Sequence, residues 1–238
     1  MGPGDPRYPS MARRGYNRRF EGRPERIHVA RSTDDVVRAV DDAVRSGGHC
    51  FENFVDAPDV RVVIDLSEMK AVRHDRRRDA FEVESGATLG EMYPRLYVGW
   101  GVTVPGGTHA SVGVGGHVSG GGYGALCRLH GLSVDHLYAV EAVVVDRSGR
   151  ARSMVATREP SDPNRDLWWA HTGGGGGNFG IATRYWFRSP GGRPLPAPPR
   201  ARCTAWTTRR APSTASRSSQ VACGGASPTG RPPPCTGT

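Results

Sequence analysis

The chain has 238 residues, of which 37% are hydrophobic and 23% are charged, and its formal net charge at pH 7 is +9. This length is enough for one domain, or two small ones, with a substantial core. The charge does not indicate a nucleic-acid partner, because the seven arginines of 191–238, a range without Asp, Glu or Lys, leave only about +2 for the rest. No run reaches the roughly 18 apolar residues of a membrane span, and no apolar leader is present. We therefore expect a cytoplasmic protein with neither nucleic-acid nor membrane partners.

Neither the cysteines nor most histidines indicate a disulfide framework or a metal site. The five cysteines are an odd number without a CxxC pair, which favours reduced thiols; they are Cys50, Cys127, Cys203, Cys223 and Cys235. Five histidines lack the spacing of metal ligands, and we expect surface or core roles for them; they are His28, His74, His130, His136 and His171. We expect no metal.

The first predicted elements form a short α+β pattern. Residues 1–22 are polar and rich in Arg and Gly, and we expect them to be irregular. A short strand is predicted over 27–30. A helix should begin at the capping sequence 32–35 and continue through Val44, because its apolar residues recur at helical spacing. That helix then runs directly into Arg45, with no strand between them.

The remaining elements continue this pattern. The sequence Thr88-Leu89-Gly90-Glu91 is a capping box that predicts the start of an amphipathic helix. The turn sequence 146–149 predicts a β-hairpin between strands over 139–145 and 151–156. Further strands are expected over 59–66, 80–84 and 180–187, and a short helix over 166–170.

Residues 105–124 are the central feature of the chain, since nine of these twenty residues are glycine. Such a stretch is a poor helix and a poor strand, and it usually allows a close approach to the backbone. Successive glycine N–H groups can converge on an anion or on a flat polar ring edge. A tight loop without a ligand is the simpler alternative, although so many glycines cost chain entropy. His109 and His117 would stand beside the ligand.

Three glycine-containing motifs occur in an order that resembles a known family. They are Arg45-Ser46-Gly47-Gly48-His49, the stretch 105–124, and 166–180. In this order they resemble flavoprotein oxidases of the vanillyl-alcohol-oxidase type, in the berberine-bridge-enzyme-like branch, and most of all the hexose oxidases of glycopeptide-antibiotic biosynthesis. The resemblance implies a PCMH-type FAD-binding domain over 23–190, with two small α/β subdomains and the flavin between them.

The resemblance assigns roles to the first motif. It implies that the imidazole of His49 carries FAD through a covalent bond to the 8α-methyl group, which raises the reduction potential of the flavin. It also implies that Arg45, Ser46, Gly47 and Gly48 cradle the pyrophosphate. The residues alone leave simpler roles open, because His49 could bond a backbone carbonyl and the glycines could cap a helix.

The other two motifs supply the remaining predicted contacts. The resemblance implies that the isoalloxazine and pyrophosphate are lined by Gly113, Val114, Gly115, Gly116, His117, Gly120, Gly121 and Gly122. It implies that the ribityl or adenine part meets Asn178, Gly180 and Ile181. The spacing Gly175-x-Gly177-x-x-Gly180 also matches a dinucleotide fingerprint, but strand-forming residues follow it where a Rossmann turn would open a helix.

His109 departs from the family pattern. Doubly attached members have a cysteine eight residues before the histidine that matches His117, and this cysteine bonds flavin C6. An imidazole cannot form that thioether, so we expect a single attachment through His49, with His109 as a polar neighbour of the dimethylbenzene edge. Cys127 is expected to be a small buried hydrophobic residue and no substitute.

Two further departures suggest a damaged gene. Relatives have about eight more residues, including a strand, before the motif that matches Arg45. Residues 191–238 contain nine prolines and few large apolar side chains, so we expect a disordered tail there. Relatives have a substrate domain in this place, which supplies the catalytic base. We therefore expect a frameshift, a missing substrate domain, and no catalytic residue that can be named.

The implied function is that of an FAD-dependent oxidase. A sugar, another alcohol or a glycopeptide-like molecule would lose a proton and a hydride, and dioxygen would reoxidise the flavin to give hydrogen peroxide. The alternative is a flavin-binding remnant without turnover. A nucleic-acid binder finds support only in the Arg-rich tail, which lacks interleaved aromatic residues.

Overall fold

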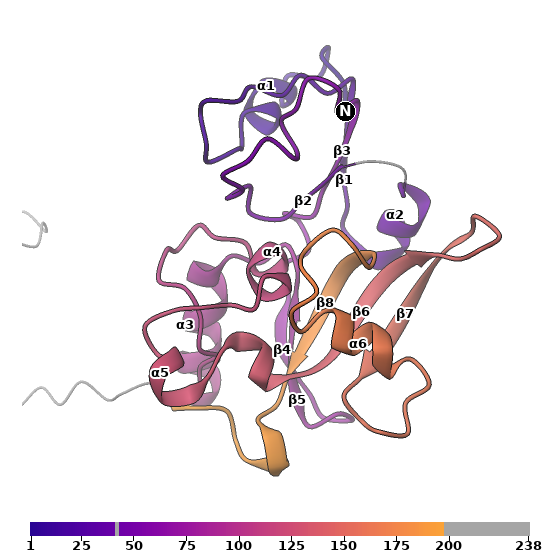
Figure 1. The fold of residues 1–238 in the computed structure, drawn as a ribbon. Coiled ribbons are helices and arrows are strands. Elements are labelled where there is room, and N and C mark those ends of the chain that lie inside the picture. Colours follow the sequence, from indigo (N-terminus) through magenta and orange to yellow (C-terminus); the bar gives the residue numbers. More distant parts are fainter. Residues whose placement is uncertain (41–42, 198–238) are drawn as a thin grey trace, which may run out of the picture. The chain divides into compact units, whose positions relative to one another are not determined.

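Two β-sheets organise the part of the chain that this computed structural model describes, residues 1–40 and 43–197 (Figure 1). The chain divides into two units, Met1–Pro199 and Arg200–Thr238, and all described residues belong to the first. In the described ranges no helix has both the length and the apolar character needed to cross a membrane.

The first sheet is parallel and has three strands. Its strand order is β1 (Arg26–Val29), β3 (Val62–Asp65) and β2 (Ala43–Arg45). Ile27, Val63 and Ile64 are buried, as expected for a parallel strand pair covered on both faces. The predicted strands over 27–30 and 59–66 are confirmed; β1 begins and ends one residue earlier, and β3 is shorter at both ends.

The predicted helix before Arg45 is wrong in its second half. Helix α2 (Thr33–Arg38) begins with the expected capping box of Ser32 and Asp35, but it ends at Arg38. Ala43–Arg45 instead form β2, which pairs in parallel with β3, so that Val44 lies opposite Ile64 and Arg45 opposite Asp65. Backbone pairing with β3 outweighs the helical spacing of the apolar residues. The strand that we expected to be lost is therefore retained at the expense of the helix.

The N-terminal segment also departs from the expectation of an irregular structure. It contains helix α1 (Tyr8–Ala12), in which Ala12 is buried. Ala12 packs with Ile27 and Val63 in one apolar cluster, and the Tyr8 hydroxyl donates to Pro24 O at 2.5 Å. A five-residue helix is too short for a periodic pattern, so only its packing on the first sheet reveals it.

The second sheet is antiparallel and has five strands. Its order is β4 (Val72–Asp75), β5 (Ala80–Glu84), β8 (Ile181–Phe187), β6 (Leu137–Val145) and β7 (Ala151–Thr157). The predicted strand over 80–84, the hairpin and the final strand are confirmed. The short, half-exposed strand β4 was not predicted.

Helices and turns surround the larger core. Helix α3 (Leu89–Trp100) has the expected capping box, and it buries Leu89, Met92 and Leu96. Helix α6 (Arg165–Ala170) matches the predicted short helix. The other elements are α5 (Cys127–His130), η1 (Ser133–His136) and η2 (Pro190–Gly192).

Helix α4 (Val114–Ser119) forms inside the glycine-rich stretch, where we expected no regular structure. Val114 and Val118 are separated by one helical turn, and both are buried in the larger core. These two anchors hold a six-residue helix despite two glycines between them. Packing therefore outweighs the low helix propensity of the sequence.

The folded unit continues past residue 190, the expected domain boundary. Leu195 is buried in the same cluster as Leu96 and Val104, and Thr103 N–H donates to Pro196 O at 2.7 Å. Residues 191–197 therefore do not fit the expectation of a tail without core contacts. The rest of that expectation, for 198–238, falls outside the described residues.

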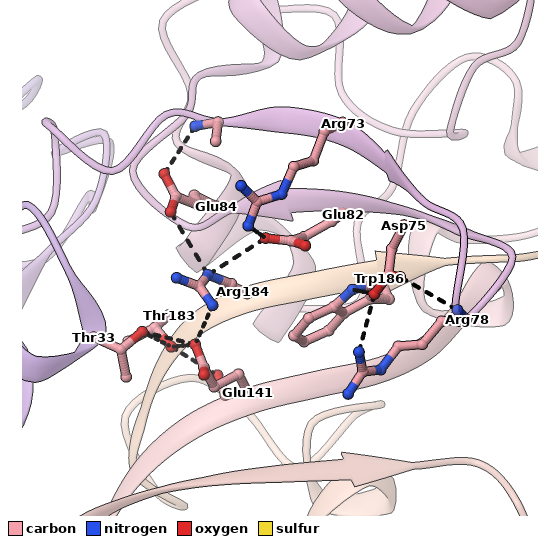
Figure 2. A network of polar contacts seen from close by, with 11 residues as sticks. Thr33, Arg73, Asp75, Arg78, Glu82, Glu84, Glu141, Thr183, Arg184 and Trp186 are labelled. Atoms are coloured by element: carbon pink, nitrogen blue, oxygen red, sulfur yellow. Dashed lines mark hydrogen bonds and ion pairs between the residues drawn. The ribbon is translucent and has the colours of Figure 1, made fainter.

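A buried polar network connects α2 to the second sheet. Figure 2 shows the carboxylate of Glu141 beside Thr33 and Thr183, whose hydroxyl groups each donate to Glu141 Oε2 at 2.7 Å. Arg184 Nη1 lies 3.6 Å from the same oxygen. Glu141 is thus the shared acceptor for one residue of α2 and two of β8.

We predict that Glu141→Ala strongly destabilises the chain. The substitution removes the carboxylate that accepts from two buried hydroxyl groups, which costs about 1–3 kcal/mol for each unsatisfied group. It also removes one of the three carboxylates around Arg184, which keeps Glu82 and Glu84. Urea unfolding followed by circular dichroism measures the loss. Glu25→Ala, which removes an exposed ion-pair partner of Arg61, is the control and should leave the midpoint nearly unchanged. Equal midpoints for the two variants would contradict the structural role of Glu141.

Candidate functional site

A cavity of about 510 Å³ lies where the segment after β2 meets the segment before and within α4. Two of its walls are formed by residues 44–51 and by residues of 109–117, and Tyr16 adds to the lining. Nine of the predicted binding residues line it, namely Arg45, Ser46, Gly47, Gly48, His49, His109, Gly113, Gly116 and His117.

The two walls meet at a contact between glycines. A Cβ atom on Gly47 would overlap the backbone N of Gly113, and a Cβ on Gly113 would overlap the backbone N of Gly47. Alanine at either position would therefore push the two segments apart. The sequence suggested that these glycines allow a ligand to approach, but at Gly47 and Gly113 the approaching group is the chain itself.

Several backbone N–H groups at this junction are available to a ligand. Within the described residues, no acceptor bonds the N–H groups of Gly47, Gly48, His49 or Gly116. A Cβ on Gly116 would meet no atom within 4 Å, so this glycine leaves open space on the cavity side. Backbone N–H groups without an acceptor, next to open space, are typical of an anion site.

The side chain of Arg45 supports the loop and does not point at a ligand. It is 3% exposed, its Nε donates to Asp65 Oδ2 at 2.8 Å, and its Nη2 donates to Met11 O at 2.6 Å. Asp65 also accepts from Arg14 Nη1 at 2.6 Å. Burial alone would raise the pKa of Asp65, but hydrogen bonding by Ser67 and the charges of Arg45 and Arg14 outweigh burial and lower it. Asp65 therefore stays ionised between two guanidinium groups.

Ser46 ties the same loop to the second sheet. Its hydroxyl donates to Ser85 O at 2.6 Å, and Gly115 N–H donates to the same carbonyl at 3.0 Å. The three residues join the loop after β2, the end of β5 and helix α4. Ser46 thus lines the cavity, while Ser85 and Gly115 hold its loop in place from outside the lining.

His49 lies in a cluster of rings at the cavity. Its ring stacks on Tyr16, with centroids 4.2 Å apart and planes inclined by 21°, and the ring of His109 lies 4.8 Å away. Its Nε2 lies 2.6 Å from Ser111 Oγ, which lies 3.2 Å from His109 Nδ1. Burial, and then the nearby His109, lower the pKa of His49, so the ring is neutral at pH 7.

His117 supports the opposite wall. Its Nε2 accepts a hydrogen bond from Gly107 N–H at 2.9 Å, and burial lowers its pKa. The Tyr93 hydroxyl donates to Gly107 O at 2.7 Å. The ring of His117 thus fixes the turn at 105–107 while one side of it lines the cavity.

Comparison with known proteins identifies the family. Residues 24–153 match the model of a family described as FAD binding domain. The chain belongs to this FAD binding domain family. The predicted oxidase family and its α+β, PCMH-type fold are confirmed.

Named relatives include antibiotic and sugar oxidases. Aclacinomycin-N/aclacinomycin-A oxidase from Streptomyces galilaeus is 62% identical over 195 residues, which are 79% of this chain and 36% of that protein. Hexose oxidase from Chondrus crispus is 40% identical over 208 residues, which are 82% of this chain and 37% of that protein. A solved glycopeptide hexose oxidase, complexed with teicoplanin, superimposes with a TM-score of 0.82 at 54% identity over 84% of this chain and 43% of that one. The chain thus spans about two fifths of the length of these relatives.

The remaining predicted contacts do not line the cavity of this FAD binding domain. Val114 is buried behind its wall, and Gly122 has a positive φ of 72° where a Cβ would overlap Ser133. Gly120 and Gly121 follow α4, and neither they nor Gly115 line the cavity. Ile181 begins β8, and Asn178 and Gly180 precede it; Asn178 Nδ2 donates to Gly174 O at 3.1 Å. Because Ile181 begins a strand, the dinucleotide fingerprint opens no helix, as expected.

Cys127 is half-buried, whereas we expected a fully buried small hydrophobic residue. Its Sγ accepts from Gly124 N–H at 3.1 Å, so it supports the turn before α5. His136 and His171 are buried core residues, as expected. Among the described residues, no three His, Cys, Asp or Glu side chains gather to form a metal site.

Sequence reasoning missed Tyr16, Ser111 and Asp65. Tyr16 precedes the segment that carries the resemblance, and no local pattern marks it. Ser111 lies within the glycine-rich stretch, but its contact with His49 spans 62 positions of the chain. The one available signal for Asp65 was an aspartate directly after the apolar run Val62–Ile64. Such a position is expected to be buried, and a buried carboxylate requires partners.

The features of the cavity fit FAD. The unpaired N–H groups after β2 and at Gly116 suit a pyrophosphate, and the space beside Gly116 suits a group that comes close to the backbone. The ring of His49 lies at the same cavity, with its Nδ1 bonded by no described residue. The FAD binding domain therefore brings backbone N–H groups without a described acceptor and an imidazole ring to the same cavity.

We predict opposite effects of alanine at two glycines of this FAD binding domain. Gly113→Ala should lower the free energy of unfolding by about 1–3 kcal/mol, because the new methyl group overlaps Gly47. Gly116→Ala is the matched control in α4 and should leave stability unchanged or raise it by up to about 1 kcal/mol. Thermal unfolding of the two variants measures the difference. A Gly113→Ala protein as stable as the native chain would refute the close contact of the two walls.

Proposed function

We propose that the chain binds FAD in this cavity, attached through His49, and that it forms the flavin-binding part of an oxidase for a sugar or another alcohol. The observation that carries the proposal is that one cavity is lined by the ring of His49 and by four residues whose backbone N–H groups are bonded by no described acceptor. The sugar and antibiotic oxidases among the relatives support the substrate class.

Each wall of the cavity has its own part in binding. The N–H groups of Gly47, Gly48, His49 and Gly116 would donate to the pyrophosphate, while Asp65 and Arg45 hold the first wall in place. Bound FAD would accept a hydride from the carbon of a deprotonated substrate hydroxyl and pass the electrons to dioxygen, which yields hydrogen peroxide. His117 would keep the second wall closed through its bond to Gly107.

The predicted contacts at Gly120, Gly121, Gly122, Asn178, Gly180 and Ile181 remain part of the proposal. Gly121 and Gly180 have positive φ values of 100° and 105°, so their backbone is held in a conformation that few other residues adopt. The proposal assigns them to the parts of FAD that extend beyond the cavity.

The second candidate is a flavin-binding protein without turnover. The described lining of the cavity contains no carboxylate, and no residue of this chain is assigned as the base for a substrate hydroxyl. Anaerobic addition of glucose or an aminosugar glycoside distinguishes the two candidates, because only an oxidase bleaches the flavin absorbance.

We predict that the full chain retains a yellow flavin after acid precipitation. A covalent bond to His49 survives denaturation, whereas flavin that is held only by hydrogen bonds is released. The visible spectrum of the redissolved pellet measures the covalent share, and gel filtration before precipitation measures the total. His49→Ala should keep bound flavin in the native protein and release it in acid.

His74→Ala is the control, because His74 lies on β4 next to Asp79 and does not line the cavity. This variant should keep the covalent flavin. A folded native chain that takes up no FAD in excess would overturn the proposed function. Covalent flavin in His49→Ala would overturn the attachment site alone.

A further inference from the structure

Ser111 stands between two imidazole rings. Its Oγ lies 2.6 Å from Nε2 of His49 and 3.2 Å from Nδ1 of His109, so one hydroxyl group contacts a ring nitrogen on each side. A serine hydroxyl can donate one hydrogen bond and accept another at the same time. The three residues therefore form a continuous path for a proton.

We propose that Ser111 and His109 form a proton relay that makes Nδ1 of His49 the nitrogen that bonds the flavin. This proposal rests on the proposed function, because it concerns how His49 becomes attached to FAD. Ser111 and His109 are positioning residues in it, since they act through His49.

The contacts of His49 select its reactive nitrogen. Ser111 occupies Nε2, whereas no described residue bonds Nδ1. Stacking on Tyr16 fixes the plane of the ring, with 21° between the two planes. When Nε2–H donates to Ser111 and the Ser111 hydroxyl donates to His109 Nδ1, the lone pair of His49 is on Nδ1. The tautomer that the relay requires is thus also the one with a nucleophilic Nδ1.

The proton path follows from the charge that attachment creates. A bond from Nδ1 to carbon leaves a positive charge on the His49 ring while Nε2 still carries its proton. That proton passes to Ser111 Oγ as the Ser111 proton passes to His109 Nδ1. His109 is exposed, so its other ring nitrogen can release a proton to solvent. The described lining of the cavity holds no carboxylate that could do this instead.

The atoms and electrons of the attachment balance with dioxygen as the oxidant. One C–H bond of the 8α-methyl group and the N–H bond of the imidazole are replaced by one C–N bond. The two electrons released reduce the flavin, which takes up two protons. Dioxygen, the oxidant of the proposed reaction, then accepts these two electrons and two protons and becomes hydrogen peroxide.

The relay also gives His109 a function. The comparison with the cysteine that forms a thioether in doubly attached relatives assigns none to a histidine at this position. An imidazole at this position cannot bond flavin C6 through sulfur, but its ring nitrogens can accept and donate hydrogen bonds. The ring centroid of Tyr16 lies 5.7 Å from that of His109 and 4.2 Å from that of His49, so the three rings form one cluster beside Ser111. In this chain a base would thus stand where doubly attached relatives have a second attachment.

The test follows the rate of covalent attachment when FAD is added to the flavin-free full chain. Total bound flavin is measured by gel filtration, and covalent flavin by acid precipitation. Ser111→Ala and His109→Ala should attach the flavin that they bind on the order of 100-fold more slowly than the native chain, with the rate expressed per bound flavin; about 100-fold is the usual contribution of a general base. Ser148→Ala, in the turn between β6 and β7, is the control and should match the native rate.

Recovery of the attachment rate, by a conservative variant or by added imidazole, distinguishes a proton relay from a merely structural role. Ser111→Thr keeps the hydroxyl and should restore most of the rate, and added imidazole should accelerate attachment in His109→Ala but not in Ser111→Ala. Attachment at the native rate in Ser111→Ala would overturn the relay. Non-covalent FAD alone in the native chain would also overturn it, while FAD binding would stand. A native chain that binds no FAD would overturn the proposed function and the relay with it.

Discussion

The contact between Gly47 and Gly113 is the constraint on which the cavity depends. Two segments approach so closely there that neither position has room for a Cβ atom. The contact brings the loop after β2 against the first turn of α4, and residues of both segments line one cavity. Without it, the two segments would not form the two walls of one cavity.

A buried charge cluster around Asp65 stabilises the loop that makes this contact. Asp65, at the end of β3, is fully buried and bonds both Arg45 and Arg14. Burying such a cluster is costly unless its hydrogen bonds are satisfied, and removing one partner leaves an uncompensated charge. The cluster therefore sets the end of β2 and also draws in the N-terminal segment, whose Tyr16 N–H donates to Gly48 O at 2.7 Å. Tyr16 reaches the ring of His49 as a consequence.

Local patterns predicted much of the fold, whereas tertiary pairing decided the rest. The capping boxes at Ser32 and Thr88 and the turn at 146–149 depend on neighbours within a few residues, so the sequence reveals them. Strand β2 and helix α4 form against their own local preference. Pairing with β3 stabilises β2, and packing of Val114 and Val118 in the larger core stabilises α4. At the site, the glycines and His49 were identified, but the Ser111 contact joins residues far apart in the chain and leaves no local signal.

The most direct test of the account is the response of individual backbone amides to FAD. We predict that FAD shifts the ¹⁵N–¹H signals of Gly47, Gly48, His49 and Gly116 in the full chain and slows their hydrogen exchange, because these groups gain an acceptor. Gly149, in the turn between β6 and β7, should not change. FAD that binds while these four amides keep their signals and exchange rates would contradict the account.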